Sequence, residues 1–334
     1  MTDPPDESPP DLAKAGEIEE RLLGGPRRHT RTEAAAFADV SPDYAQRLWR
    51  ALGFANVGEG AAAFTDGDLI ALDRLMTLVR SEFLDEELAV SVTRALGHNV
   101  ARLVEWQVEA LGEHLEHTRG LAPAEALRAA VDLSSDHLEE FEALLVYAWR
   151  RQLAAVAGRV LAERDADADA VSGVLSVGFA DLVSFTRLSQ RLEERELAAL
   201  VDRFGRRSAD VIAAAGGRLV KTVGDEVLFV ADSAARAARI GLDLAETMAK
   251  DPVLPDVRVG IATGTVLTRM GDVFGRTVNL ANRLIALAAP GTVLADSETT
   301  DALAHDPDFV LDGARTRAVR GMGLVRPGLV RRRR

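Results

Sequence analysis

The sequence predicts an α+β protein in which an all-helical N-terminal part precedes a part that mixes strands and helices. Three observations support this class. Apolar residues recur at helical spacing up to about residue 160, the polar run RDADADA at 164–170 interrupts the pattern, and β-branched runs alternate with helical segments beyond it. A length of 334 residues also suits about two domains.

The first part contains several signals for the start of a helix. We expect a helical domain at residues 17–160. Ser41 is placed to cap a helix with Pro42 at its first position, and Thr65 with Asp66 begins another. A long amphipathic helix runs from about Ser135 into the 160s. We expect residues 1–16, which are acidic and Pro-rich, to form a disordered tail, and residues 161–171 to form a linker.

The second part, residues 172–334, reads as strand, helix, strand, strand, helix, strand, with an α-β unit appended. This order predicts a ferredoxin-like βαββαβ core. Helices gathered on one face of such a sheet would leave the other face free. The basic residues Arg331 to Arg334 suggest a frayed end of the chain.

The composition indicates the cellular compartment that suits the protein. The chain has no cysteine, which excludes a disulfide scaffold and thiolate metal sites and suits a reducing cytoplasm. The acidic N-terminus lacks the features of a signal peptide, and no apolar run is long enough to span a bilayer. We therefore expect a cytoplasmic protein without a membrane span.

Charge is divided unevenly along the chain. Residues 1–170 hold 17 basic and 32 acidic side chains, whereas residues 171–334 hold 23 and 20. An acidic first part repels a polyphosphate backbone, which makes a nucleic-acid partner unexpected. The second part is the better host for an anionic substrate.

A charged hairpin stands out in the second part. In GGRLVKTVGDEVLFV, two β-branched runs flank Gly224 and Asp225, which is a turn signal. Lys221 and Asp225 are not needed by a plain hairpin. Asp181 ends the strand that a ferredoxin-like sheet places beside this hairpin, so Asp181 and Asp225 could share hard divalent cations such as Mg²⁺. Taken singly, each aspartate could equally well end a strand or make a turn.

Asn279 and Arg283 are four residues apart in GDVFGRTVNLANRL, so a helix places them on one face. An arginine fork suits phosphate oxygens, and an asparagine side chain suits a ribose or a phosphate. The pair alone fits a solvated helix face just as well.

Three blocks, FADLVSFT, KTVGDEVLF and GDVFGRTVNLANRL, together resemble the catalytic domain of class III adenylyl cyclases, over about residues 172–322. The resemblance implies that Asp181 and Asp225 bind two Mg²⁺ or Mn²⁺ ions. It also implies a homodimer, in which the aspartates of one chain face nucleotide-binding groups of the other across an isologous interface.

The same resemblance assigns the nucleotide-binding groups. Lys221 and Asp272 read the adenine ring, Asn279 orients the ribose, and Arg283 stabilises charge on the phosphate in the transition state. A lysine only donates and a carboxylate only accepts, which fits adenine and penalises guanine. The implied reaction is attack of the 3′-hydroxyl of ATP on its own α-phosphate, giving 3′,5′-cyclic AMP and pyrophosphate. Ser184 departs from the family, which usually has glycine there in the phosphate loop.

The helical part resembles the regulatory domain that precedes the catalytic domain in some actinobacterial-type cyclases, which implies autoinhibition and a response to a proton or a small lipid. Five of the six histidines lie in this part: His29, His98, His114, His117 and His137. Histidine titrates near neutral pH, so a pH response is a hypothesis, although each of these histidines alone reads as a solvated side chain.

An alternative of another class concerns residues 30–75, which also resemble a MerR-like DNA reader. The chain would then be a DNA-binding regulator with a cyclase-like dimer module. Arg27, Arg28 and Arg31 favour this alternative, whereas the acidity of the helical part opposes it.

Overall fold

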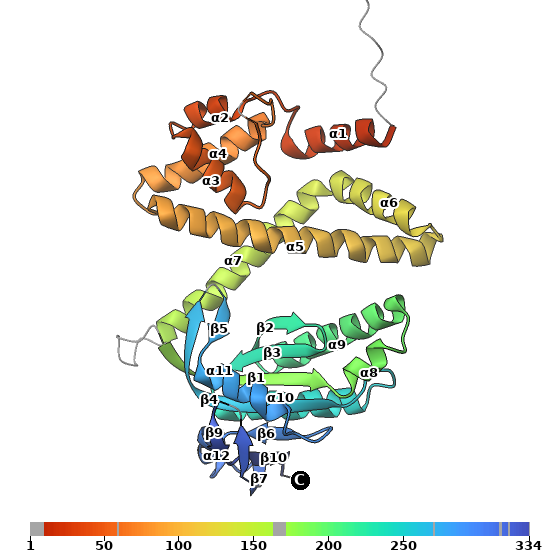
Figure 1. Cartoon of the computed structure of the whole chain (residues 1–334), viewed down its shortest axis with the longest axis vertical. Coiled ribbons are helices and arrows are strands. Elements are labelled where there is room, and N and C mark those ends of the chain that lie inside the picture. The colour runs from red at the N-terminus through yellow and green to blue at the C-terminus, as the bar shows by residue number, and fades with distance from the viewer. Residues whose placement is uncertain are drawn as a thin grey trace, which may run out of the picture. The chain divides into compact units, whose positions relative to one another are not determined.

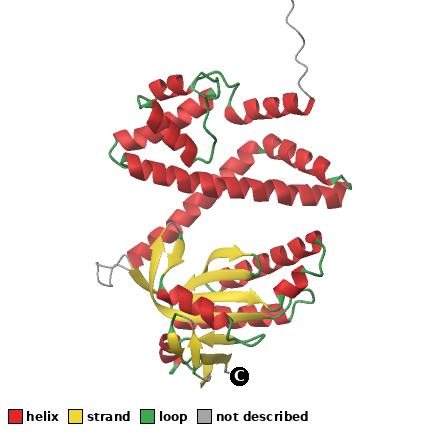
Figure 2. Ribbon diagram, in the orientation of Figure 1, coloured by secondary structure: helices red, strands yellow, loops and turns green. Residues whose placement is uncertain are grey.

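The structure is a computed structural model that describes residues 10–58, 60–162, 172–269, 271–313, 316–319 and 321–333. The chain divides into two compact units between Asp165 and Ala166. Figure 1 labels the elements of both units, and Figure 2 shows that the first unit is built from helices while the second mixes strands and helices. Most of the segment expected as a linker, residues 163–171, lies outside the described residues, as do residues 1–9 of the expected tail.

The first unit confirms the expected all-α domain. Its helices are α1 (Pro10–Leu23), α2 (Arg31–Phe37), α3 (Pro42–Ala51), α4 (Asp66–Arg80), α5 (Glu86–Arg119), α6 (Pro123–Asp136) and α7 (Leu138–Ala162). Helix α1 begins within the stretch for which we expected disorder. The long helix expected from Ser135 begins instead at Leu138, because α6 continues to Asp136 and the chain turns at His137.

The predicted caps explain where the short helices begin. The Ser41 hydroxyl accepts a hydrogen bond from Tyr44 N at 3.2 Å, with Pro42 in the first turn of α3. Thr65 caps α4, where Asp68 Oδ2 accepts from Thr65 N at 2.7 Å and completes a capping box. An isolated β-bridge between His29 and Phe64 joins the segment between α3 and α4 to the residues just before α2.

The second unit is built on one large sheet. Its strands are β1 (Ser172–Leu182), β2 (Arg218–Val223), β3 (Glu226–Ala231), β4 (Val257–Arg269), β5 (Asp272–Phe274), β6 (Val293–Ala295), β7 (Phe309–Gly313), β8 (Arg317–Val319), β9 (Gly323–Val325) and β10 (Gly328–Arg332). Its helices are α8 (Phe185–Ser189), α9 (Glu194–Ala214), α10 (Ala234–Ala249), α11 (Arg276–Ile285) and α12 (Ser297–Leu303).

The strand order confirms the ferredoxin-like core. The sheet runs β2-β3-β1-β4-β6-β10-β7, and β5 pairs with β4. The first four strands in this order are antiparallel neighbours, as a βαββαβ unit requires. Strand β6 joins β4 in parallel and extends the sheet, and β8 and β9 form a separate hairpin.

Both faces of the sheet are covered in part, so the expectation of one free face is wrong. Helices α9 and α10 pack over one core, which includes Leu182, Phe229 and Ile261. Helix α11 packs over the opposite face, where Phe179 and Val278 are buried. The helix that carries Asn279 and Arg283 therefore packs directly on the sheet as part of a second core.

Small residues on β4 bring α11 close to the sheet. A Cβ at Gly260 would clash with the carbonyl oxygen of Ala281 and would lie 2.9 Å from Ile285 N. A Cβ at Gly264 would lie 2.8 Å from Thr277 Oγ1. Glycine at these two positions is thus what sets the depth at which α11 sits.

The C-terminal arginines do not form the frayed end that the sequence suggested. Strand β10 ends at Arg332 and lies between β6 and β7. Arg332 donates to Asp243 at 2.5 Å and to Glu246 at 3.3 Å, and Arg331 pairs with Asp312 at 3.3 Å. Acidic side chains of neighbouring elements thus hold the basic strand in place; Arg334 lies outside the described residues.

Candidate active site

The two predicted metal aspartates lie together at one end of the central strands. Asp181 is near the end of β1, directly opposite Glu226 of β3. Asp225 occupies the turn between β2 and β3 with Gly224, whose φ of 59° is of the kind that favours glycine. Leu182 N donates to Asp225 O at 3.0 Å, which holds the turn against β1.

Burial and charge make this pair costly when both groups are ionised. Burial, followed by the charge of Asp225 and a hydrogen bond with it, raises the pKa of Asp181 from 3.8 to about 6. Arg258 counteracts this rise in part, because its Nη2 donates to Asp181 Oδ2 at 2.7 Å. Two carboxylates that repel each other in this way form a site that a divalent cation would neutralise.

The donor set fits Mg²⁺ or Mn²⁺ bound together with a nucleotide. In the described part of the chain no group of three or more histidine, cysteine, aspartate or glutamate side chains is arranged to hold a metal alone. Mg²⁺ is commonly bound by one or two carboxylates, with phosphate oxygens and water completing its shell. Asp181 and Asp225 would supply the protein ligands of such a shell.

Lys221 and Asp272, the predicted base-reading pair, contact each other. Lys221 Nζ donates to Asp272 Oδ2 at 2.6 Å. Burial alone would raise the pKa of Asp272, but the hydrogen bonds from Lys221 and from Val273 N outweigh it and hold this pKa below its ordinary value. Asp272 therefore stays an ionised acceptor beside a cationic donor, the combination that complements adenine.

Asn279 and Arg283 lie on the exposed side of α11, as their spacing predicts. Neither side chain has a hydrogen-bond or ion-pair partner among the described residues. Both are thus available to a ligand, while Ala281 and Leu284 of the same helix are fully buried.

The structure therefore joins the predicted residues in pairs within one chain. Asp181 lies with Asp225, Lys221 lies with Asp272, and Asn279 shares a helix face with Arg283. No hydrogen bond or ion pair links one of these pairs to another across residues 172–269 and 271–313.

Ser184 sits in a backbone conformation that favours glycine. Its φ is 64° and its ψ is 25°, in the left-handed region, at the position before α8. The hydroxyl makes no capping hydrogen bond. This geometry explains why glycine is suited to this turn and what serine costs there.

Comparison with known proteins identifies the family of the chain. The family model described as "Adenylate and Guanylate cyclase catalytic domain" matches residues 169–327. An adenylate cyclase of Streptomyces coelicolor is 46% identical over 98% of this chain and 93% of its own. The chain belongs to the class III adenylate cyclases. It is a lyase that binds a nucleotide and forms cyclic AMP.

A second curated relative agrees with the assignment. An adenylate cyclase of Glutamicibacter nicotianae is 42% identical over 93% of the chain and 80% of its own length. The crystal structure of the catalytic core of a rhodopsin-guanylyl cyclase with converted specificity, in complex with ATPalphaS, covers 49% of this chain at 24% identity and a TM-score of 0.46.

Two contacts of this cyclase escaped the analysis of its sequence. Arg258, which pairs with Asp181, lies opposite it across β1 and β4. Glu226 follows Asp225, and Asn282 of α11 donates to Glu226 Oε2 at 3.1 Å. A basic residue beginning the strand VRVGIATG was the available signal for Arg258; the Asn282 contact depends on how α11 docks and has no local signature.

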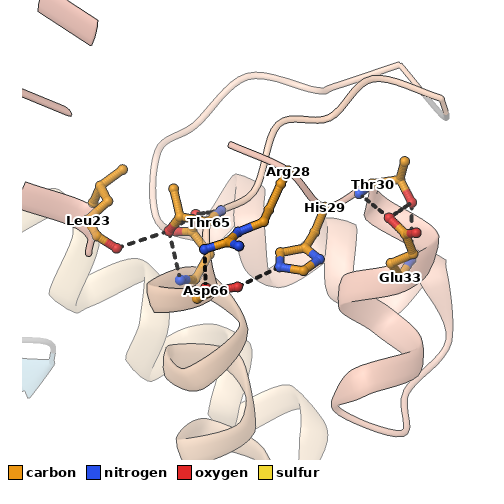
Figure 3. A network of polar contacts seen from close by, with 8 residues as sticks. Leu23, Arg28, His29, Thr30, Glu33, Thr65 and Asp66 are labelled. Atoms are coloured by element: carbon orange, nitrogen blue, oxygen red, sulfur yellow. Dashed lines mark hydrogen bonds and ion pairs between the residues drawn. The ribbon is translucent and has the colours of Figure 1, made fainter. Parts of the chain in front are cut away.

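Two of the three N-terminal arginines that favoured a DNA reader, Arg27 and Arg28, are paired with carboxylates. Arg27 contacts Glu19, and Arg28 donates to Asp66 at 2.7 Å (Figure 3). Arg47 of α3 pairs with Glu87. Phosphates of a duplex would have to displace these partners, so the structure adds no support to the DNA-binding alternative.

His29 differs from the other histidines of the helical unit. His98, His114, His117 and His137 are exposed, whereas His29 is half-buried and its Nε2 lies 2.7 Å from Asp66 Oδ1. This contact holds the pKa of Asp66 below its ordinary value. Asp66 begins α4 and also accepts from Arg28, so one carboxylate fastens the segment before α2 to α4 (Figure 3).

An apolar cavity of about 200 Å³ lies within the same unit, between α2, α3, α4 and α5. Its walls include Leu48, Trp49, Leu52, Phe64, Leu72 and Leu75. Arg31 and Asp68 also line it. No helix in the described parts of the chain is long and apolar enough to cross a membrane.

Proposed function

We propose that this cyclase converts ATP to 3′,5′-cyclic AMP and pyrophosphate at the interface of a homodimer. The observation that carries the proposal is the separation of the pairs within one chain. Among the described residues, no hydrogen bond or ion pair joins the carboxylates Asp181 and Asp225 to the groups suited to base, ribose and phosphate. A second, antiparallel copy of the chain completes each site.

Each group has a part that follows from its chemistry. When bound, two Mg²⁺ or Mn²⁺ ions on Asp181 and Asp225 activate the 3′-hydroxyl and bind the phosphates. Lys221 and Asp272 hold the adenine edge, which selects ATP over GTP. Asn279 orients the ribose.

Two arginines meet the phosphates. Arg283 is exposed on α11 and stabilises charge that develops on the α-phosphate. Arg258 lies beside Asp181, and its guanidinium group suits phosphate oxygens bound at the same place.

The proposed activity is tested by incubating the purified chain with ATP or GTP and with Mg²⁺ or Mn²⁺. We expect cyclic AMP and pyrophosphate in equal amounts from ATP and little cyclic product from GTP. Equal rates with both nucleotides would contradict the roles given to Lys221 and Asp272.

We also propose that the helical domain, residues 17–160, regulates the cyclase in response to a proton or a small lipid. The His29–Asp66 contact supports a proton, because protonation places a positive charge on His29 against an ionised carboxylate. The cavity supports a lipid, since its walls are mostly apolar. At about 200 Å³ it is smaller than the roughly 300–1,000 Å³ of common ligand sites, so it holds only part of an acyl chain.

The regulatory proposal is tested on the full chain with His29→Gln. If a proton acts through His29, activity of this variant should depend less on pH than activity of the wild type. The part of the pH dependence that is lost is the part that does not change with metal concentration. An unchanged profile would remove His29 from the account, and titration with a fatty acid would then test the cavity.

A further inference from the structure

A polar contact ties α11 to the hairpin that carries Asp225. Asn282 Nδ2 donates to Glu226 Oε2 at 3.1 Å, between residues 56 positions apart in the sequence. Both side chains are half-buried. Glu226 is the first residue of β3, immediately after Asp225, and it lies directly opposite Asp181.

Small residues of β4 form the seam on which α11 packs. The helix contacts β4 where the strand presents Gly260, Ala262 and Gly264, so no large side chain projects from the strand into the helix there. Interdigitating side chains are what normally fix the register of packed elements. Directional hydrogen bonds constrain the helix near both ends: Thr277 Oγ1 donates to Thr265 O at 2.9 Å near its start, and the Asn282–Glu226 contact lies toward its end.

The contact joins parts of two different sites in the proposed dimer. Helix α11 carries Asn279 and Arg283, which serve one site, whereas the hairpin carries Asp225, which serves the other. Residues 279, 282 and 283 lie within one turn of the helix, so a shift that breaks the Asn282 contact also moves Asn279 and Arg283.

We propose that Asn282 is a positioning residue, which holds α11 against Glu226 so that the ribose- and phosphate-binding groups and the metal carboxylates form one rigid block. This inference rests on the proposed function. It adds that the hydrogen bond aligns both sites of the dimer from within each chain.

The test reverses the polarity of the hydrogen bond without changing its shape. Asn282→Asp has the same size but cannot donate, and it places a carboxylate against Glu226. We expect kcat to fall by roughly 10- to 100-fold, as a misplacement of about 1 Å at a site can cause. The double variant Asn282→Asp with Glu226→Gln restores a hydrogen bond, now donated by residue 226, and should recover most of the lost kcat.

A matched control and two further readouts separate positioning from folding. Asn99→Asp adds the same charge to the exposed face of α5 and should leave kcat unchanged. Thermal unfolding of the full chain and KM for ATP are measured for every variant, and positioning predicts that kcat changes far more than KM.

The outcomes distinguish this inference from the function on which it rests. Wild-type kcat in Asn282→Asp, or a loss that Glu226→Gln does not recover, would overturn the positioning role while wild-type cyclic AMP synthesis upholds the function. A wild-type chain that makes no cyclic AMP would overturn both.

Discussion

Arg258 and Asp181 face each other across neighbouring antiparallel strands, with Nη2 and Oδ2 2.7 Å apart. Among the described side chains, the arginine is the only cationic group bonded to this carboxylate. It opposes the combined effect of burial and of Asp225 on the pKa of Asp181. The pair thus affects the pH range in which Asp181 is ionised and can serve the proposed metal site.

Replacing Arg258 with alanine should raise the pKa of Asp181 further. Loss of an opposite charge at this distance shifts a carboxyl pKa by about 1–3 units, and one unit corresponds to roughly tenfold in metal affinity below that pKa. Mn²⁺ titrations at pH 6 without nucleotide measure the effect. Arg258→Lys, which keeps the charge, should lose less; equal losses in both variants would show that charge is not the reason.

Metal binding by the wild-type chain should weaken as the pH falls below about 6, because a cation competes with the proton on Asp181. The affinity for Mn²⁺ should drop by roughly tenfold per pH unit in that range. Binding that stays constant between pH 5 and pH 7 would contradict the raised pKa.

The same group makes the stability of the metal-free chain depend on pH. Folded Asp181 keeps its proton up to about pH 6, whereas the unfolded chain releases it near 3.8. This stabilisation is complete below 3.8 and is lost as the pH rises through about 6. Melting curves of the wild type and of Asp181→Asn should therefore converge at low pH and diverge toward neutral pH, with the variant the more stable there.

Ser184→Gly should stabilise the catalytic unit. A non-glycine residue in the left-handed region costs roughly 1–2 kcal/mol. Glycine removes this cost, but the greater conformational freedom of glycine in the unfolded chain offsets about 0.5–1 kcal/mol of the gain. We expect a gain of up to about 1 kcal/mol, together with a lower KM for ATP. Ser189→Gly, at the last residue of α8, is the control and should be destabilising; a loss of stability in both variants would argue against strain at Ser184.

Gly260→Ala should displace α11. The added Cβ would meet the backbone of Ala281 and Ile285, and overpacking of this kind costs about 1–3 kcal/mol. Activity should fall with stability, because Asn279 and Arg283 move with the helix. Gly173→Ala in β1 is the matched control, since its Cβ would meet nothing within 4 Å. Wild-type activity in Gly260→Ala would show that the depth of α11 is not critical.

Much of this fold could be predicted because its signals are local. Ser41 and Thr65 cap helices through their own neighbours, and Gly224 with Asp225 forms the turn that the flanking strands indicate. The sequence predicted a shared role for Lys221 and Asp272 in reading the base, but not that the two side chains contact each other. The structure adds the distance and the ionised state of Asp272.

What could not be predicted depends on contacts between distant segments. The placement of α11 on the second sheet face follows from glycines on β4, which in the sequence read only as part of a strand. Arg331 and Arg332 resemble a loose basic end until β6 and β7 are seen to flank them. Asn282 and Glu226 are in contact only because a hairpin and a helix that are separate in the sequence pack together.

Mixing two inactive variants tests the shared site most directly. Asp181→Ala and Arg283→Ala should each be inactive alone, because each removes one group from both sites of its homodimer. In a re-equilibrated mixture half of the dimers are mixed and each keeps one intact site, so cyclic AMP synthesis should return to about a quarter of the wild-type rate. No recovery, in a sample whose mixed dimers are demonstrated by two different affinity tags, would contradict sites built from two chains.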